Sequence, residues 1–239
     1  MLFSLLEGSD FSSALISLLL SLPVIMLALS IHETAHGFAA WKCGDDTAYN
    51  LGRLSLNPFK HLDLLGVLSM LLIGYGWAKP VPINTRNLRN PKWGMALCAA
   101  AGPLANLLLG AFSALCYGVF SALFNYLSIL QIPAFLLTCA DVLVNLCLIS
   151  AYLNFVFAVF NLIPVPPFDG SRLALVFLPT RLYFGIMRYE RQIMLGVLGA
   201  LLILNYFDLS PFGWIASKLT LLIAEPVFKA IIPLLFPRI

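Results

Sequence analysis

Five long apolar segments restrict how this chain can fold more than any other feature of its sequence. They cover residues 11–41, 93–126, 134–160, 191–207 and 212–236. Each reaches the roughly 17–25 residues that a helix needs to cross a bilayer, and the first three exceed that length. Only 10% of the residues are charged, against about 25% in soluble domains. The sequence therefore predicts an all-α polytopic membrane protein with five to six transmembrane segments.

A sixth apolar run, residues 62–77, is shorter and contains three glycines. A run of this length can form either a re-entrant hairpin or a crossing. The hairpin leaves loops 42–61, 78–92 and 161–191, which hold most of the lysines and arginines, on one side. Because basic loops stay in the cytoplasm, we expect a multi-pass cell-membrane protein with a re-entrant 62–77 and these loops inside.

Charge and cysteine content exclude several other classes of protein. The net charge of +3 is too small to indicate nucleic-acid binding. The five cysteines have no CxxC spacing, so neither a disulfide framework nor a cysteine zinc site is expected. The N-terminal stretch carries acidic residues and no basic residue before the first apolar run, unlike a cleavable signal peptide. We therefore expect one membrane domain over residues 1–239.

The first apolar segment contains the motif His32-Glu33-Thr34-Ala35-His36. On a helix, positions i and i+4 share a face, so both imidazoles can reach one metal ion. Glu33 projects about 100° away, close enough to hold a water at the metal without ligating it. Two core histidines bonded to backbone or water are the structural alternative. Ionisable residues within a membrane helix are costly and functional by default, which favours a zinc site with Glu33 as general base.

A catalytic zinc ion usually takes a third protein ligand, and Asp169 is the candidate. Asp169 follows the 134–160 segment, after three prolines that break the helix between Asn161 and Gly170. This break can fold back to the depth of the two histidines, and the charge pattern puts both on the inner side. A turn aspartate beside a glycine is the structural alternative.

Together these residues resemble the site-2 protease family of intramembrane zinc metalloproteases. The resemblance rests on four stretches that occur in the family's order: the H-E-x-x-H motif, Gly-Arg-Leu-Ser-Leu-Asn-Pro at 52–58 running on to His61 and Asp63, Gly-Pro-Leu-Ala-Asn at 102–106, and Asn161 to Asp169-Gly170. It implies a compact form without a PDZ or CBS domain, with a catalytic core at about 11–172 and additional helices at about 190–236.

The resemblance also implies roles for the site residues. His32, His36 and Asp169 would bind Zn²⁺, and Glu33 would act as general base and acid. Asn161 and Asn106 would place the substrate carbonyl or stabilise the oxyanion. For Asn106, an interhelical hydrogen bond in a closely packed membrane helix is an equal alternative.

Residues 52–58 alternate polar and apolar side chains with period two, which is typical of a half-buried strand, and Pro58 closes the run. An exposed strand edge can bind an extended peptide through its backbone. We therefore predict a short membrane-associated β-strand region in which Leu54, Ser55 and Leu56 bind substrate. The alternative is an interfacial loop with Leu54 and Leu56 dipping into lipid.

The predicted function is intramembrane zinc metalloendopeptidase activity on membrane-spanning or membrane-associated substrates, with the active site toward the cytoplasm. The expected partners are the lipid bilayer and a membrane-protein or signal-peptide substrate, and nothing in the sequence specifies an oligomeric state. A metal transporter using the same ligands and a catalytically inactive membrane scaffold are the alternatives. The transporter would need ligands toward both faces, and the scaffold would be expected to lack Glu33 or Asp169.

Overall fold

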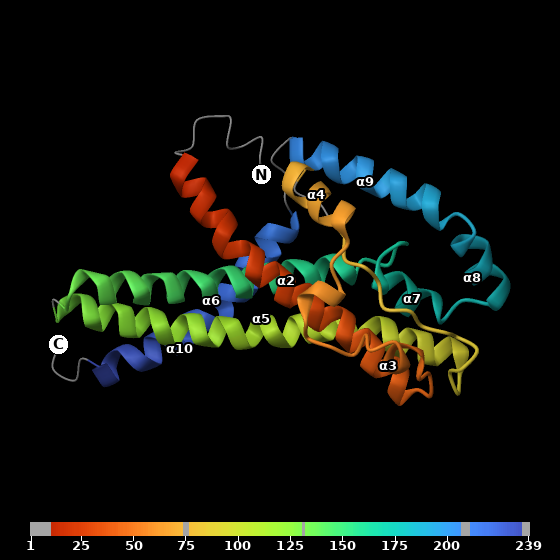
Figure 1. The fold of residues 1–239 in the computed structure, drawn as a ribbon, viewed down its shortest axis with the longest axis horizontal. Coiled ribbons are helices and arrows are strands. Elements are labelled where there is room, and N and C mark those ends of the chain that lie inside the picture. Colours follow the sequence, from red (N-terminus) through yellow and green to blue (C-terminus); the bar gives the residue numbers. More distant parts are fainter. Residues whose placement is uncertain (1–10, 74–76, 131, 207–210, 236–239) are drawn as a thin grey trace.

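The structure is a computed structural model that describes residues 11–73, 77–130, 132–206 and 211–235 (Figure 1). Four of its helices are long: α2 (Phe11–Lys42), α5 (Pro91–Ile129), α6 (Ala134–Asn161) and α10 (Pro211–Leu235). The shorter ones are α3 (Thr47–Asn50), η1 (Pro58–Lys60), α4 (Leu64–Ile73), α7 (Asp169–Leu175), α8 (Thr180–Met187) and α9 (Glu190–Tyr206). The chain is therefore mostly helical, as its apolar segments predict.

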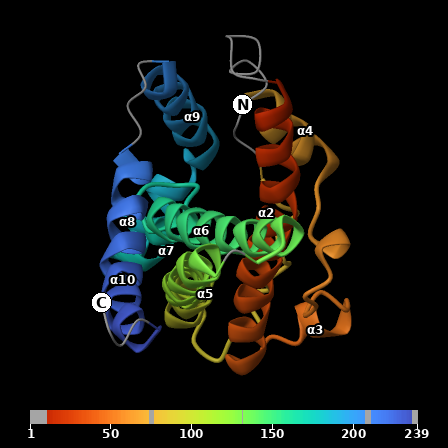
Figure 2. The ribbon, with the colours of Figure 1, turned by 90° about the vertical axis from the view of Figure 1, so that its left-hand side faces the viewer.

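Helices α5 and α6 form a long antiparallel pair at the centre of the molecule (Figures 1 and 2). Helix α2 crosses this pair and contacts both of its members, and α10 packs along both as well. Helices α5, α6 and α10 approach closely around the buried Phe155 because each contributes a small buried side chain there. These are Ala114, Ala151 and Ala216. Close packing of α2 against α5 and α6 brings residues far apart in the sequence to one place, where the site described below is formed.

Three of the described helices are long and apolar enough to cross a membrane: Leu18–Lys42, Pro91–Ile129 and Ala134–Asn161. The predicted class of helical membrane protein is therefore supported, but the predicted five to six spans are not confirmed. Helix α9 has only 17 residues, and α10 carries three charged residues in its 25. Length and charge thus separate these two C-terminal helices from the three candidate spans.

The two ends of the 62–77 segment lie side by side. Leu62 and Ala78 form an isolated antiparallel bridge, and the Lys79 N–H donates to the His61 carbonyl at 2.8 Å. Helix α4, which lies between them, has 10 residues and is about 15 Å long, half of the roughly 30 Å bilayer core. The segment leaves and returns to one place, as a re-entrant segment requires, although residues 74–76 lie outside the described residues.

The predicted strand over residues 52–58 is not found in the described part of the chain. Gly52 has a φ of 62°, a left-handed turn conformation that glycine adopts without steric cost. The Ser55 N–H donates to the Arg53 carbonyl at 3.0 Å, and the Asn57 N–H donates to Ser55 Oγ at 3.2 Å. The strand assignment was wrong because local turns use these backbone donors, so the alternating pattern does not reflect a ladder.

A buried carboxylate, Asp45, joins the end of α2 to the loop that precedes α5. It accepts hydrogen bonds from Thr47, from Asn87 Nδ2 at 2.9 Å and from the Asn84 N–H at 2.7 Å. Burial acts to raise the pKa of Asp45, but these donors outweigh it and hold the pKa below its ordinary value. Asp45 therefore stays ionised and fixes the 84–87 turn beside α2.

Candidate metal centre

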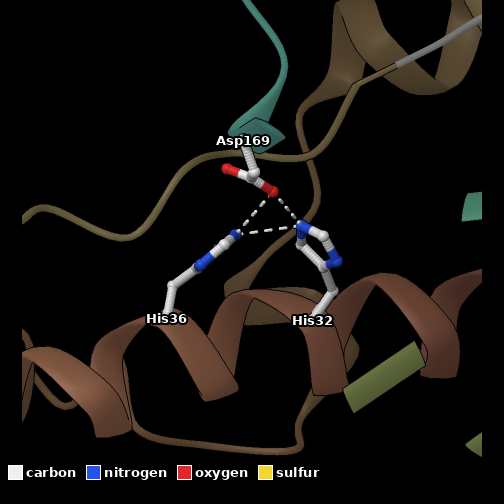
Figure 3. Close-up of side chains that lie close together, drawn as sticks. All are labelled: His32, His36 and Asp169. Carbon is white, nitrogen blue, oxygen red and sulfur yellow. Dashed lines mark hydrogen bonds and ion pairs between the residues drawn. The ribbon is translucent and has the colours of Figure 1, made fainter. Parts of the chain in front are cut away.

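Three side chains from two helices converge at one point (Figure 3). His32 and His36 extend from one face of α2, and Asp169 points at both from the start of α7. Asp169 Oδ2 lies 3.2 Å from each Nε2 atom, and the two Nε2 atoms are 2.9 Å apart. These spacings are close to the roughly 3.3 Å edges of a tetrahedral zinc site with ligands at 2.0–2.2 Å. The structure thus brings together the three ligands that the sequence predicts.

Hydrogen bonds on the far side of each ring indicate why a cation fits between them. His36 Nδ1 lies 2.7 Å from the Cys98 carbonyl oxygen, which can only accept, so Nδ1 carries the proton. His32 Nδ1 lies 2.5 Å from Asn106 Oδ1, which likewise accepts. In the neutral rings both Nε2 atoms therefore present lone pairs to each other and to the Asp169 carboxylate. Three electron-pair donors without a shared proton are suited to a metal ion.

The absence of a side chain at Gly102 lets α5 approach the imidazoles. A Cβ atom at this position would lie 2.5 Å from His36 Nε2 and 2.7 Å from His32 Cε1. Real Cβ atoms essentially never come this close to other heavy atoms, so only glycine fits here without a shift. The Gly-Pro-Leu-Ala-Asn run therefore serves the site through packing as well as through Asn106.

A compact turn after α6 carries Asp169 back to α2. Helix α6 ends at Asn161, and the rings of Phe160 and Phe168 meet across the turn at 4.4 Å between centroids. A Cβ on Gly170 would overlap the carbonyl oxygen of Leu162, so the turn closes only around a glycine. The proline-rich break thus folds back to the depth of the histidines, as predicted.

Glu33 lies half-buried beside the candidate metal ligands and is held by a different part of the chain. Its Oε2 accepts a hydrogen bond from the Val81 N–H at 2.9 Å. On the next residue, Thr34 Oγ1 donates to the Ser55 carbonyl at 2.8 Å. Two non-helical segments therefore flank Glu33, and Arg53 links them by donating to the Lys79 carbonyl at 2.8 Å.

The residues predicted to bind substrate, Leu54, Ser55 and Leu56, belong to the first of these segments. The Ser55 carbonyl also lies 2.7 Å from Nε2 of the buried His61, so it is held from two sides. Leu54 is half-buried, whereas Leu56 is 59% exposed. The segment contacts α2 at Thr34, the residue that follows Glu33. Its role in substrate binding stays a prediction.

The two predicted asparagines are placed differently. Asn106 is fully buried, and its Oδ1 is the atom that meets His32, which is the interhelical hydrogen bond that the sequence left open as an alternative. Asn161 is half-buried and donates to the Phe157 carbonyl of its own helix at 3.0 Å. A role for either at the substrate carbonyl stays a prediction.

Asn154 belongs to the site although no motif of the sequence pointed to it. It is fully buried in α6, and its Oδ1 accepts from Asn106 Nδ2 at 2.8 Å. Two features of the sequence could have pointed to it: an asparagine within an apolar membrane helix is unusual, and Ser150 lies one turn before it on the same face.

The fold and the site together define a class: a helical membrane protein with an H-E-x-x-H motif and a distant aspartate that together could hold a metal ion. The chain belongs to Peptidase family M50, whose model matches residues 20–204. This match confirms the resemblance to site-2 proteases.

Two curated relatives carry names of the same kind. The "Putative zinc metalloprotease YwhC" of Bacillus subtilis is 38% identical over 149 residues, 62% of this chain and 64% of that protein. The "Putative zinc metalloprotease Rip2" of Mycolicibacterium smegmatis is 30% identical over 159 residues, 61% of this chain and 52% of that protein. The match thus spans less than two thirds of either relative, and no solved structure matches the chain.

Proposed function

We propose that this protein is a zinc-dependent endopeptidase that cuts other membrane-associated polypeptides within or close to the bilayer. One observation carries the proposal: one candidate ligand atom from each of His32, His36 and Asp169 lies within 4.8 Å of the other two. The two histidines and Glu33 belong to a helix that is apolar enough to span the membrane. Membership of a peptidase family and the zinc-metalloprotease names of two relatives support the same activity.

The residues of the site divide the chemistry between them. A bound Zn²⁺ ion would polarise the scissile carbonyl and make water more acidic. Glu33 takes the proton from the attacking water and returns it to the leaving amine, a role for which it must not itself ligate the metal. The Val81 N–H orients the Glu33 carboxylate for this role.

The proposed substrates are membrane-spanning or membrane-associated polypeptides, including remnant signal peptides. A helical peptide bond is shielded and already hydrogen-bonded, so the substrate must be extended at the site. Within the described part of the chain, no hydrogen bond joins the backbone N–H of Leu54 or Leu56 to another group. We propose that these free groups bind the extended substrate beside Glu33.

Replacing Leu54 with proline tests this role, because proline has no N–H. Losing one backbone hydrogen bond costs about 0.5–1.5 kcal/mol, so turnover should fall about twofold to tenfold while bound zinc is unchanged. Leu54→Ala keeps the N–H and should have a smaller effect. If Leu54→Pro and the wild type had equal turnover in a detergent assay, the substrate-binding role would be wrong. The alternative, an interfacial loop with Leu54 and Leu56 dipping into lipid, would then be favoured.

The proposed orientation has the site toward the cytoplasm of a cell membrane. The basic loops support it, and so does the contact of Asp45 with Asn84 and Asn87, which keeps two of those loops together. In a cysteine-free background, Asn50→Cys and Thr85→Cys should react with an impermeant thiol reagent only from the cytoplasmic side, and Leu130→Cys only from the other. Labelling of positions 50 and 85 from opposite faces would contradict the proposed orientation.

A purified, lipid-reconstituted protein and a membrane-anchored reporter test the proposed function. Cleavage should require one tightly bound zinc ion, stop on its removal by a chelator, and return when zinc is restored. Zinc transport without cleavage would favour a transporter, and zinc binding with neither activity would favour a scaffold.

A further inference from the structure

A chain of buried hydrogen bonds extends from the metal centre into the bundle. His32 on α2 meets Asn106 Oδ1 on α5, and Asn106 Nδ2 donates to Asn154 Oδ1 on α6 at 2.8 Å. Asn154 Nδ2 in turn donates to the Ser150 carbonyl of its own helix at 2.8 Å. Both asparagines are 0% exposed, so bulk water does not compete for these groups. The chain links one metal ligand to a backbone carbonyl of another helix.

The direction of the bonds in this chain follows from the backbone carbonyls at its ends. Asn106 Nδ2 also donates to the Ala28 carbonyl, but at 3.4 Å this contact is longer than the 2.8 Å bond to Asn154. A backbone carbonyl can only accept, so the Ser150 oxygen must face the NH₂ end of Asn154. The Oδ1 end of Asn154 then faces Asn106 and requires the NH₂ end of that amide. Asn106 therefore presents Oδ1 to His32, and an acceptor at this place requires the proton on His32 Nδ1.

The position of this proton decides whether His32 can bind a metal. With the proton on Nδ1, the Nε2 lone pair faces His36 and Asp169. If the Asn106 amide were reversed, its NH₂ end would face Nδ1 and the proton would sit on Nε2. A protonated nitrogen has no lone pair for a metal, so the reversed amide would block the site.

We infer that Asn154 is a positioning residue for the metal centre: as the nearer of the two acceptors of Asn106 Nδ2, it holds the direction of the Asn106 amide and, through it, the tautomer of His32. Asn154 acts through Asn106, since within the described part of the chain it makes no hydrogen bond to the imidazole itself. This inference rests on the proposed function, because it assumes that His32 ligates zinc. It assigns a function to a residue outside the motifs of the sequence.

Zinc affinity, measured by competition with a chelator on the full-length protein, tests the inference. Asn154→Leu should weaken zinc binding by about 10- to 100-fold, the usual effect of losing a partner of a ligating histidine. Asn145→Leu on the same helix is the matched control, because Asn145 bonds Asp141 and should leave zinc affinity unchanged.

A second background separates positioning from packing. In Asn106→Asp both oxygens of the side chain accept, so His32 Nδ1 faces an acceptor whether or not Asn154 is present. Asn154→Leu in this background should change zinc affinity by no more than about twofold, the additivity error of independent sites. An equal loss in both backgrounds, or no loss in the wild-type background, would overturn the inference.

Nitrogen NMR of the metal-free protein at mildly alkaline pH gives an independent measurement. The wild-type His32 ring should carry its proton on Nδ1, and Asn154→Leu should shift population to the Nε2 tautomer. A wild-type His32 protonated on Nε2 would overturn the inference even if Asn154→Leu does not fold. A wild type with the Nδ1 proton but no zinc affinity would overturn the proposed function and leave the hydrogen-bond chain standing.

Discussion

Replacing Glu33 with glutamine is expected to abolish cleavage while leaving zinc bound. The Glu33 carboxylate is not one of the three converging ligands, so the metal affinity should not depend on it. A neutral amide cannot take a proton from water, and general acid–base catalysis typically contributes about 10²–10⁴-fold. The amide oxygen can still accept from the Val81 N–H, which keeps the flanking segment in place. Turnover of the reporter and metal content per protein should be measured on the same preparation.

The control for this substitution is Glu225→Gln on α10. Glu225 is exposed and paired with Lys229, so the same change of side chain there should leave turnover unchanged. Loss of zinc in Glu33→Gln would mean that Glu33 helps to hold the metal. Turnover within tenfold of the wild type would mean that another group takes the proton.

Gly102→Ala is expected to have the second large effect, and it acts through packing alone. The added Cβ would lie 2.5 Å from both Cε1 and Nε2 of His36, so either the imidazole or α5 must move. Overpacking of this kind costs about 1–3 kcal/mol, which corresponds to about a fivefold to 150-fold loss of zinc affinity. Chelator competition should report this loss, and reporter cleavage should fall with it.

A matched control is available because some glycines face open space. A Cβ on Gly196 of α9 would meet nothing within 4 Å, so Gly196→Ala should change neither zinc affinity nor turnover. If Gly102→Ala bound zinc as tightly as the wild type, the claim that zinc binding depends on the close approach of α5 to the two histidines would be wrong.

Local rules of the helix predict the first half of the metal centre. The i, i+4 spacing of His32 and His36 places both imidazoles on one face whatever surrounds the helix. The place of Asp169 beside the two histidines was also predictable, because few acids were available and the prolines before Asp169 end α6 and let the chain turn back. The fold class follows from the apolar segments for the same reason: lipid forces helix formation wherever the backbone crosses it.

The predictions that failed or remain unconfirmed concern non-local relationships. Period-two alternation predicts a strand over 52–58, but a strand needs a partner. Turns at Gly52 and Ser55 engage the N–H groups of Arg53, Ser55 and Asn57 instead. The number of spans could not be counted from apolarity alone, since α9 and α10 are apolar but are short or carry charge.

The sequence by itself determined that the chain is a helical membrane protein and that His32 and His36 share one face of a helix, with Glu33 beside them, in a predicted metal-binding motif. It determined this because both properties depend on neighbours within a few residues. Only the tertiary structure decided what Asn106, Asn154 and Gly102 do. Their effects on the site arise where α2, α5 and α6 pack together, and a hydrogen bond or a close approach between residues 48 to 74 positions apart leaves no periodic trace in the sequence.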